Sequence, residues 1–130
     1  MTGGERYLLD TVIVAAYFNR DPSVLSRLEL ANVYVSSVTI GELFFGDYKS
    51  TQRDENLARI RALADLVRIL PVATTTADHY GKIKLQLQRK GRPIPENDIW
   101  IAAAAFQYDL VLATRDAHFE HIEGLRLQAW

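Results

Sequence analysis

The chain contains no cysteine among its 130 residues. This absence excludes disulfide bonds, thiolate catalysis and cysteine-ligated zinc, and it fits a reducing compartment. Basic residues are not in excess either, because 15 lysines and arginines stand against 16 aspartates and glutamates. A protein that binds nucleic acid through a broad positive field usually carries a basic excess. Any contact with nucleic acid must therefore depend on a local patch or on metal ions.

Long apolar runs are also missing. The longest, at 12–18 and 99–106, fall well short of the ~20 residues that span a bilayer. The first six residues lack the apolar core of a signal peptide. We therefore expect a cytoplasmic protein with no membrane partner. With 48% hydrophobic residues and no repeat or internal linker, residues 1–130 are expected to form a single domain.

The predicted elements alternate between strand and helix. Strands are predicted at 6–10, 33–37, 68–73, 110–114 and 125–128, and helices at 11–18, from 21, and at 38–50, 54–67, 75–90 and 98–108. Ser37 is the expected N-cap of the helix at 38–50, and Gly91 the C-terminal stop of the helix at 75–90. The segment 75–90 also alternates like a strand, but its length favours a helix. This order predicts an α/β sandwich of three layers, with a mostly parallel sheet of four to five strands between helices.

Four acidic residues occupy related positions in this scheme. Asp10 ends the first strand, Asp116 follows the fourth, and Glu42 and Asp98 lie near the starts of two helices. Ligands of parallel sheets bind outside the carboxyl ends of the strands, so we expect the four side chains to converge there. Carboxylates that share a pocket repel one another, and Mg²⁺ or Mn²⁺ would compensate this charge. Such a site can activate water for phosphodiester hydrolysis.

Each of these residues also has a purely structural explanation. Asp10 and Asp98 could simply favour helix N-termini, Glu42 is a good helix former, and aspartate at 116 is common in turns. Four independent coincidences at one sheet edge are much less probable than one shared site. The joint placement therefore favours catalysis.

The neighbours of these residues resemble the PIN-domain nucleases, in particular the VapC toxins of bacterial toxin–antitoxin pairs. The matching segments are Tyr-Leu-Leu-Asp-Thr at 7–11, Ser-Ser-Val-Thr-Ile-Gly-Glu-Leu at 36–43, Ile-Pro-Glu-Asn-Asp-Ile-Trp-Ile-Ala-Ala at 94–103, Thr-Arg-Asp-Ala-His-Phe at 114–119 and the tail at 122–130. They occur in the same order and span nearly the whole chain.

The resemblance implies a PIN-like sandwich with Asp10, Glu42, Asp98 and Asp116 as metal ligands. It implies hydroxyl support from Thr11 and Thr114, and a hydrogen bond from Asn97 to a ligand or water. It further implies Mg²⁺- or Mn²⁺-dependent cleavage of structured RNA, often transfer RNA, by a homodimer whose site is covered by a VapB-type antitoxin. One similar branch is named for cutting initiator transfer RNA. The segment at 94–98 and the tail resemble that branch, whereas the segment at 114–119 differs from it.

A run of basic side chains precedes the helix predicted at 98–108, and one further arginine is adjacent to Asp116. Candidates for contact with RNA phosphates are Lys82, Arg89, Arg92 and Arg115, with Lys84 and Lys90 in the same run. A solvated helix face is the alternative for the run. His79, His118 and His121 show no metal-ligand spacing and are expected to be structural. Phe44, Phe45 and Tyr48 share a helix, and any that lies outside the core would contact a dimer mate or an antitoxin.

Two other classes of protein fit parts of the pattern. A phosphotransfer module also gathers acidic residues at a parallel sheet edge, but it needs a lysine after a late strand, where this chain has Arg115-Asp116. A non-catalytic binding domain of the same fold class would be expected to have lost at least one carboxylate. The complete acidic set therefore favours a metal-dependent ribonuclease over both.

Overall fold

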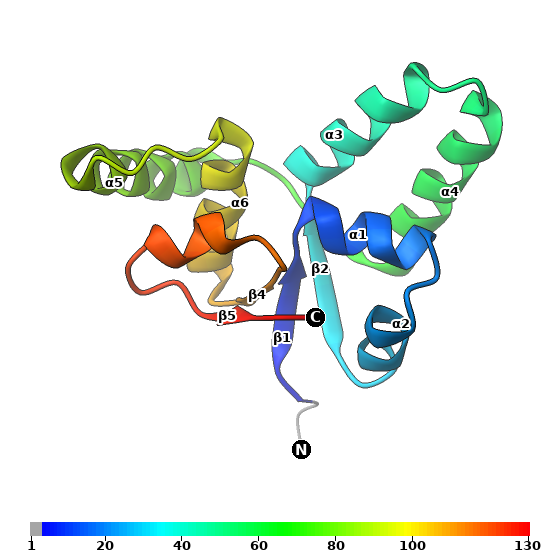
Figure 1. Ribbon diagram of the computed structural model, residues 1–130, viewed down its shortest axis with the longest axis horizontal. Helices are drawn as coiled ribbons and strands as arrows, with labels where there is room; N and C mark the ends of the chain where they lie inside the picture. Colours follow the sequence, from blue (N-terminus) through cyan, green and yellow to red (C-terminus); the bar gives the residue numbers. More distant parts are fainter. Residues whose placement is uncertain (1–3) are drawn as a thin grey trace.

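The computed structural model describes residues 4–130 and contains a five-stranded parallel sheet. The strand order is β3-β2-β1-β4-β5, with β1 at the centre (Figure 1). The strands are β1 (Arg6–Leu9), β2 (Asn32–Ser36), β3 (Arg68–Leu70), β4 (Val111–Ala113) and β5 (Leu127–Gln128). The helices are α1 (Thr11–Phe18), α2 (Pro22–Leu28), α3 (Ser37–Tyr48), α4 (Arg53–Leu66), α5 (Thr74–Lys90), α6 (Glu96–Tyr108) and the 3-10 helix η1 (Ala117–His121).

Helices cover both faces of the sheet, as the alternation of elements predicts (Figure 1). Adjacent residues of a strand point to opposite faces, and in β1 both Leu8 and Leu9 are buried. Leu8 packs in a core with residues of α5, α6 and η1, whereas Leu9 packs in a second core with residues of α1, α2 and α4. The predicted three-layer sandwich is therefore confirmed. No helix within residues 4–130 is long and apolar enough to cross a membrane.

The element boundaries differ from the predictions in four ways. β3 ends at Leu70 rather than at residue 73, because Pro71 has no N–H to donate to a neighbouring strand. The cap of α3 is Ser36 and not Ser37, since the Ser36 hydroxyl accepts the backbone N–H of Val38 at 3.0 Å. α6 begins two residues earlier than predicted, at Glu96, and η1 was not anticipated. The remaining ends coincide with the predictions or shift by one or two residues.

One turn and the pairing of the central strands position the elements that carry the acidic residues. Gly91 ends α5 with φ at +66°, a conformation that favours glycine, and so confirms its predicted role as a helix stop. Leu9 of β1 pairs with Val35 of β2 on one side and with Ala113 of β4 on the other. The carboxyl ends of the three central strands therefore lie side by side. The segments that follow β1, β2 and β4 therefore start at the same edge of the sheet.

Candidate active site

Asp10 follows β1 and is almost fully buried, with 3% of its surface exposed. Its Oδ1 accepts the backbone N–H of Ile13 at 2.9 Å and so caps α1, while Oδ2 accepts the hydroxyl of Thr114. Burial raises the pKa of Asp10, the hydrogen bonds from Thr114 and Ile13 oppose that rise, and the charges of Asp116 and Glu42 add to it. Asp10 therefore caps α1 and also lies close enough to Asp116 and Glu42 for their charges to affect its pKa.

Thr114 links two of the predicted residues. Its hydroxyl donates to Asp10 and accepts the backbone N–H of Asp116 at 2.9 Å. Asp116 in turn caps η1, because its Oδ1 accepts the backbone N–H of His118 at 2.9 Å. The loop after β4 is therefore folded around one buried hydroxyl, which holds two carboxyl-bearing residues at the same place.

Glu42 lies in α3 and is half-buried. The hydroxyl of Thr11 donates to Glu42 Oε1 at 2.6 Å, and Thr39 Oγ1 lies 3.2 Å from Thr11 Oγ1. Thr39 is fully buried and was missed by the sequence reasoning. Its position three residues before Glu42, on the same helix face, was the available signal.

Asp98 lies in the first turn of α6, and 19% of its side chain is exposed. Its pKa is raised to about 6, first by burial and then by the charges of Asp116 and Glu42. The charge of His118 opposes this rise, and that of Asp10 adds a smaller part. The four carboxyl groups predicted from sequence are therefore close enough to affect one another's protonation. We call this group of Asp10, Glu42, Asp98 and Asp116 the acidic edge.

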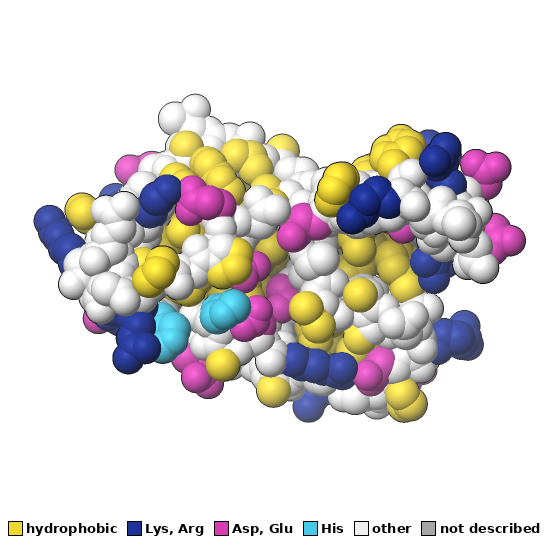
Figure 2. Space-filling model, turned by 45° about the horizontal axis from the view of Figure 1, so that its top comes forward, with side chains coloured by type: hydrophobic (Ala, Val, Ile, Leu, Met, Phe, Trp, Pro, Cys, Tyr) yellow, Lys and Arg dark blue, Asp and Glu magenta, His cyan; other side chains and the backbone are white. Residues whose placement is uncertain are grey.

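A histidine stands beside the acidic edge. His118 Nδ1 lies 3.1 Å from Asp116 Oδ1 and 3.8 Å from Asp98 Oδ2. Figure 2 shows acidic side chains in the hollow between the two halves of the molecule, with a histidine next to them. Among the three histidines expected to be structural, His118 therefore lies within reach of two carboxylates of the acidic edge. By contrast, His79 stacks on the ring of Phe106 with centroids 6.2 Å apart.

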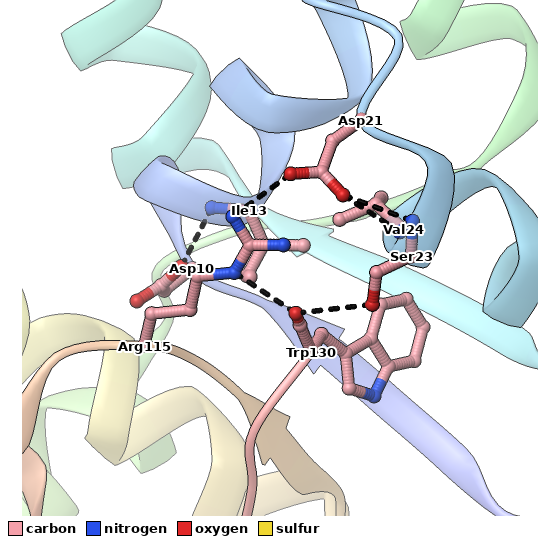
Figure 3. A network of polar contacts seen from close by, with 7 residues as sticks. All are labelled: Asp10, Ile13, Asp21, Ser23, Val24, Arg115 and Trp130. Carbon is pink, nitrogen blue, oxygen red and sulfur yellow. Dashed lines mark hydrogen bonds and ion pairs between the residues drawn. The ribbon is translucent and has the colours of Figure 1, made fainter.

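Arg115 is held by the protein itself (Figure 3). Its Nε donates to the carbonyl oxygen of Trp130 at 2.9 Å, and its Nη1 donates to Asp21 Oδ2 at 3.0 Å. This guanidinium lowers the pKa of Asp21. Through these two hydrogen bonds, Arg115 links the segment after β5 to the start of α2, next to the acidic edge.

The other predicted RNA contacts lie on or just after α5. Lys82 pairs with Asp78 at 3.0 Å, whereas Arg89 and Arg92 are exposed. The neighbouring Lys84 and Lys90 pair with acidic side chains at 2.7 Å and 3.1 Å. Asn97 is exposed in the first turn of α6, directly before Asp98.

Comparisons with known proteins agree with this architecture. The PIN domain family model matches residues 7–125. Ribonuclease VapC2 of Haemophilus influenzae is 37% identical over 129 residues, which cover 96% of this chain and 98% of that protein. The tRNA(fMet)-specific endonuclease VapC of Shigella flexneri is 33% identical with the same coverage.

A solved structure gives the same result. The VapBC2 complex of Rickettsia felis, bound to a DNA fragment from its promoter, contains a chain that matches with a TM-score of 0.90 at 28% identity. The match covers 96% of this chain and 98% of that one. The sheet order, the acidic edge and these full-length similarities lead to one conclusion. The chain belongs to the PIN-domain family and, within it, to the VapC ribonucleases.

Proposed function

We propose that this ribonuclease is an Mg²⁺- or Mn²⁺-dependent endonuclease, the toxin of a type II toxin–antitoxin pair, and that it works as a single PIN domain. Its catalytic metal ligands in this proposal are Asp10, Glu42, Asp98 and Asp116. One observation carries the proposal: these carboxyl groups lie close together at the carboxyl edge of a parallel sheet, where their charges affect one another, and the hydroxyls of Thr114 and Thr11 hold two of them in place.

The donor set fits a hard divalent cation. Carboxylate oxygens are the ligands that Mg²⁺ and Mn²⁺ prefer. Burial and mutual repulsion raise the pKa of Asp98 to about 6 and raise that of Asp10 as well. The ionised group is therefore unfavourable by itself, and a cation among the oxygens would relieve the repulsion.

The side chains of the chain itself supply orientation. When bound, a divalent cation lowers the pKa of water and stabilises the charge of a phosphodiester under attack. Asp10, held through both carboxylate oxygens, and Glu42, held by the hydroxyl of Thr11, present their oxygens in fixed directions. Such preorganisation is what an electrostatically catalysed displacement requires.

The proposed substrate is structured RNA, and within that class transfer RNA. The support is chemical and comparative: the acidic edge suits phosphodiester hydrolysis, and the Shigella flexneri relative is named a tRNA(fMet)-specific endonuclease. Lys82, Arg89 and Arg92 would contact phosphates, because they present positive charge on or after α5. Asn97, next to Asp98, would bind a ligand or water.

The proposed protein partner is a VapB-type antitoxin. The Rickettsia felis structure that matches this chain is a VapBC complex. Two adjoining hollows between α1, α2 and α4 share Tyr17, Leu63 and Leu66 in their linings, and 75% of Leu66 is exposed. Apolar surface of this kind is typical of a protein contact. We propose that an apolar segment of the antitoxin binds there.

A homodimer is proposed on a different surface. Phe45 and Tyr48 of α3 are 65% and 54% exposed, whereas Phe44 is half-buried. Exposed aromatic side chains are enriched at protein interfaces. Sedimentation of wild type and of a Phe45→Ser variant tests this contact: a dimer that dissociates in the variant supports it, and an unchanged dimer contradicts it.

The activity is tested by incubating the protein with total RNA and Mn²⁺ or Mg²⁺ and mapping the cut ends. We expect cleavage at defined positions in transfer RNA, and none after a chelator is added. Asp98→Asn is expected to abolish cleavage. Asp65→Asn, on the exposed side of α4, is the matched control and should cut at the wild-type rate. Metal-independent cleavage, or an active Asp98→Asn variant, would contradict the proposal.

A further inference from the structure

His118 occupies the open side of the acidic edge. Half of its side chain is exposed, at 52%, against 19% for Asp98 and 31% for Asp116. Its Nδ1 nevertheless lies near both carboxylates. One nitrogen or oxygen atom from each of these three residues falls within 4.8 Å of the others.

This spacing suits ligands of a single ion. Donor atoms on opposite sides of an ion with bonds of 2.0–2.6 Å lie about 4 to 5 Å apart. The three donors come from two rigid elements, since Asp98 belongs to α6 and Asp116 caps η1 through the backbone N–H of His118. That backbone hydrogen bond fixes the peptide of His118, so the imidazole starts from a defined point beside the carboxylates.

We propose that His118 provides its imidazole nitrogen Nδ1 as a ligand to the same divalent cation that Asp98 and Asp116 hold. The proposal depends on the metal site of the proposed function and adds a nitrogen donor to it. Nδ1 of His118 and the carboxylate of Asp116, which contact each other in the structure, would then both hold the ion.

A nitrogen ligand changes which metals bind well. Imidazole suits the later first-row metals, whereas Mg²⁺ binds almost exclusively to oxygen. Affinity for a mixed site of this kind rises from Mn²⁺ to Co²⁺ and Ni²⁺. The site should therefore discriminate against Mg²⁺ more strongly than a site of carboxylates alone.

Pulsed electron paramagnetic resonance of bound Mn²⁺ tests the ligand directly. The full chain, freed of metal and loaded with Mn²⁺ alone, should show the coupling of a directly bound ¹⁴N nucleus. The coupling should vanish in His118→Gln and persist in His121→Gln, the matched control on the same 3-10 helix. Absence of the coupling in wild type, or its survival in His118→Gln, would overturn the proposal.

Calorimetric titration with Co²⁺ and with Mg²⁺ gives a second readout that needs no RNA. His118→Gln should weaken Co²⁺ binding by about 10-fold or more, with a smaller change for Mg²⁺. An equal change for both metals would mean that the histidine acts only through its charge, and no change would mean that it does not act at all. Either result overturns the proposal.

The same measurements separate this proposal from the proposed function. Wild type could bind Mn²⁺ without ¹⁴N coupling, and Asp98→Asn could lose that binding. This pair of results would overturn the role of His118 but would still support the carboxylate site. If wild type bound no Mn²⁺, both would fail. Circular dichroism of His118→Gln should match wild type, because η1 is capped through the backbone of residue 118 and not through its side chain.

Discussion

The hydroxyl of Thr114 donates a hydrogen bond to Oδ2 of Asp10, although the two residues are 104 positions apart in the chain. Their proximity follows from the sheet, since Leu9 pairs with Ala113 and each residue is the next one after its strand. The same hydroxyl accepts the backbone N–H of Asp116. A single side chain thus connects two parts of the acidic edge.

Replacing Thr114 tests this connection. Thr114→Val keeps the shape of the side chain but removes the only hydrogen that it can donate to the buried Asp10 carboxylate. An unpaired buried acceptor costs about 1–3 kcal/mol, so the variant should unfold at lower urea concentration at neutral pH. RNA cleavage should fall with it. Thr114→Ser keeps the hydroxyl and should behave nearly as wild type, and equal loss in both variants would contradict the role of the hydrogen bond.

Asp98 should make the metal-free protein less stable as the pH rises. Its pKa is about 6 in the folded chain against an ordinary value of 3.8. Between these values the folded state binds more protons than the unfolded state, so the free energy of unfolding decreases from about pH 4 to pH 6 and stays lower above. The loss is about 2 kcal/mol, since a pKa unit is worth about 1.4 kcal/mol and solvent screens part of the shift.

Urea unfolding from pH 4 to pH 8 in the presence of a chelator measures this effect. Asp98→Asn should be more stable than wild type at pH 7 and should show a flatter pH dependence, whereas Asp65→Asn should follow wild type. An Asp98→Asn variant that is less stable than wild type at pH 7 would contradict the mutual repulsion at the acidic edge.

Arg115 should contribute chiefly to stability. Its guanidinium is engaged by the Trp130 carbonyl and the Asp21 carboxylate. Arg115→Ala should therefore lower Tm by a few degrees, whereas Lys82→Ala, which removes only an exposed ion pair, should leave Tm nearly unchanged. In filter-binding assays with RNA, Lys82→Ala should reduce the slope of log K against log salt by about 1. An Arg115→Ala variant with unaltered Tm would contradict the structural role.

Replacing Leu66 tests the antitoxin site proposed at the two hollows between α1, α2 and α4, which together we call the groove. Because 75% of this residue is exposed, Leu66→Asp should leave the fold and the nuclease activity intact. It should weaken binding of a co-expressed VapB-type antitoxin by about 10-fold or more, since a charge is buried against apolar surface. The amount of antitoxin that is retained together with the nuclease on an affinity column measures the effect. Leu85→Asp, an exposed leucine of α5 outside the groove, is the control, and equal retention of both variants would contradict this docking site.

The sequence was sufficient for the layers and the acidic edge because both depend on local patterns. β1 is short and mostly apolar, and Asp10 follows it directly. The sequence therefore predicts both a buried strand and a carboxylate just beyond its carboxyl end. The same holds for Glu42 and Asp98 on their helices. In a parallel sheet the carboxyl ends of the strands lie at the same edge, so the three positions are expected to be close together from the order of the elements alone.

Tertiary details could not be predicted in the same way. The proximity of His118 to Asp98 and Asp116 could not be predicted, because η1 has no sequence pattern of its own and the spacing of two residues from Asp116 matches no metal-ligand motif. The partner of Arg115 is Asp21, 94 positions away, and depends on how the segment after β5 lies against α2. The shift of the α3 cap to Ser36 reflects a choice between two adjacent serines that only the register of β2 decides.

The cleavage rate of Asp10→Asn tests most directly whether a divalent metal ion held by the carboxylates drives RNA cleavage. Cleavage of purified transfer RNA should be followed in Mn²⁺ under single-turnover conditions, after circular dichroism has confirmed that the variant is folded. Loss of one metal ligand should lower the rate by about 100-fold or more. A folded Asp10→Asn variant that cuts at the wild-type rate would contradict the account.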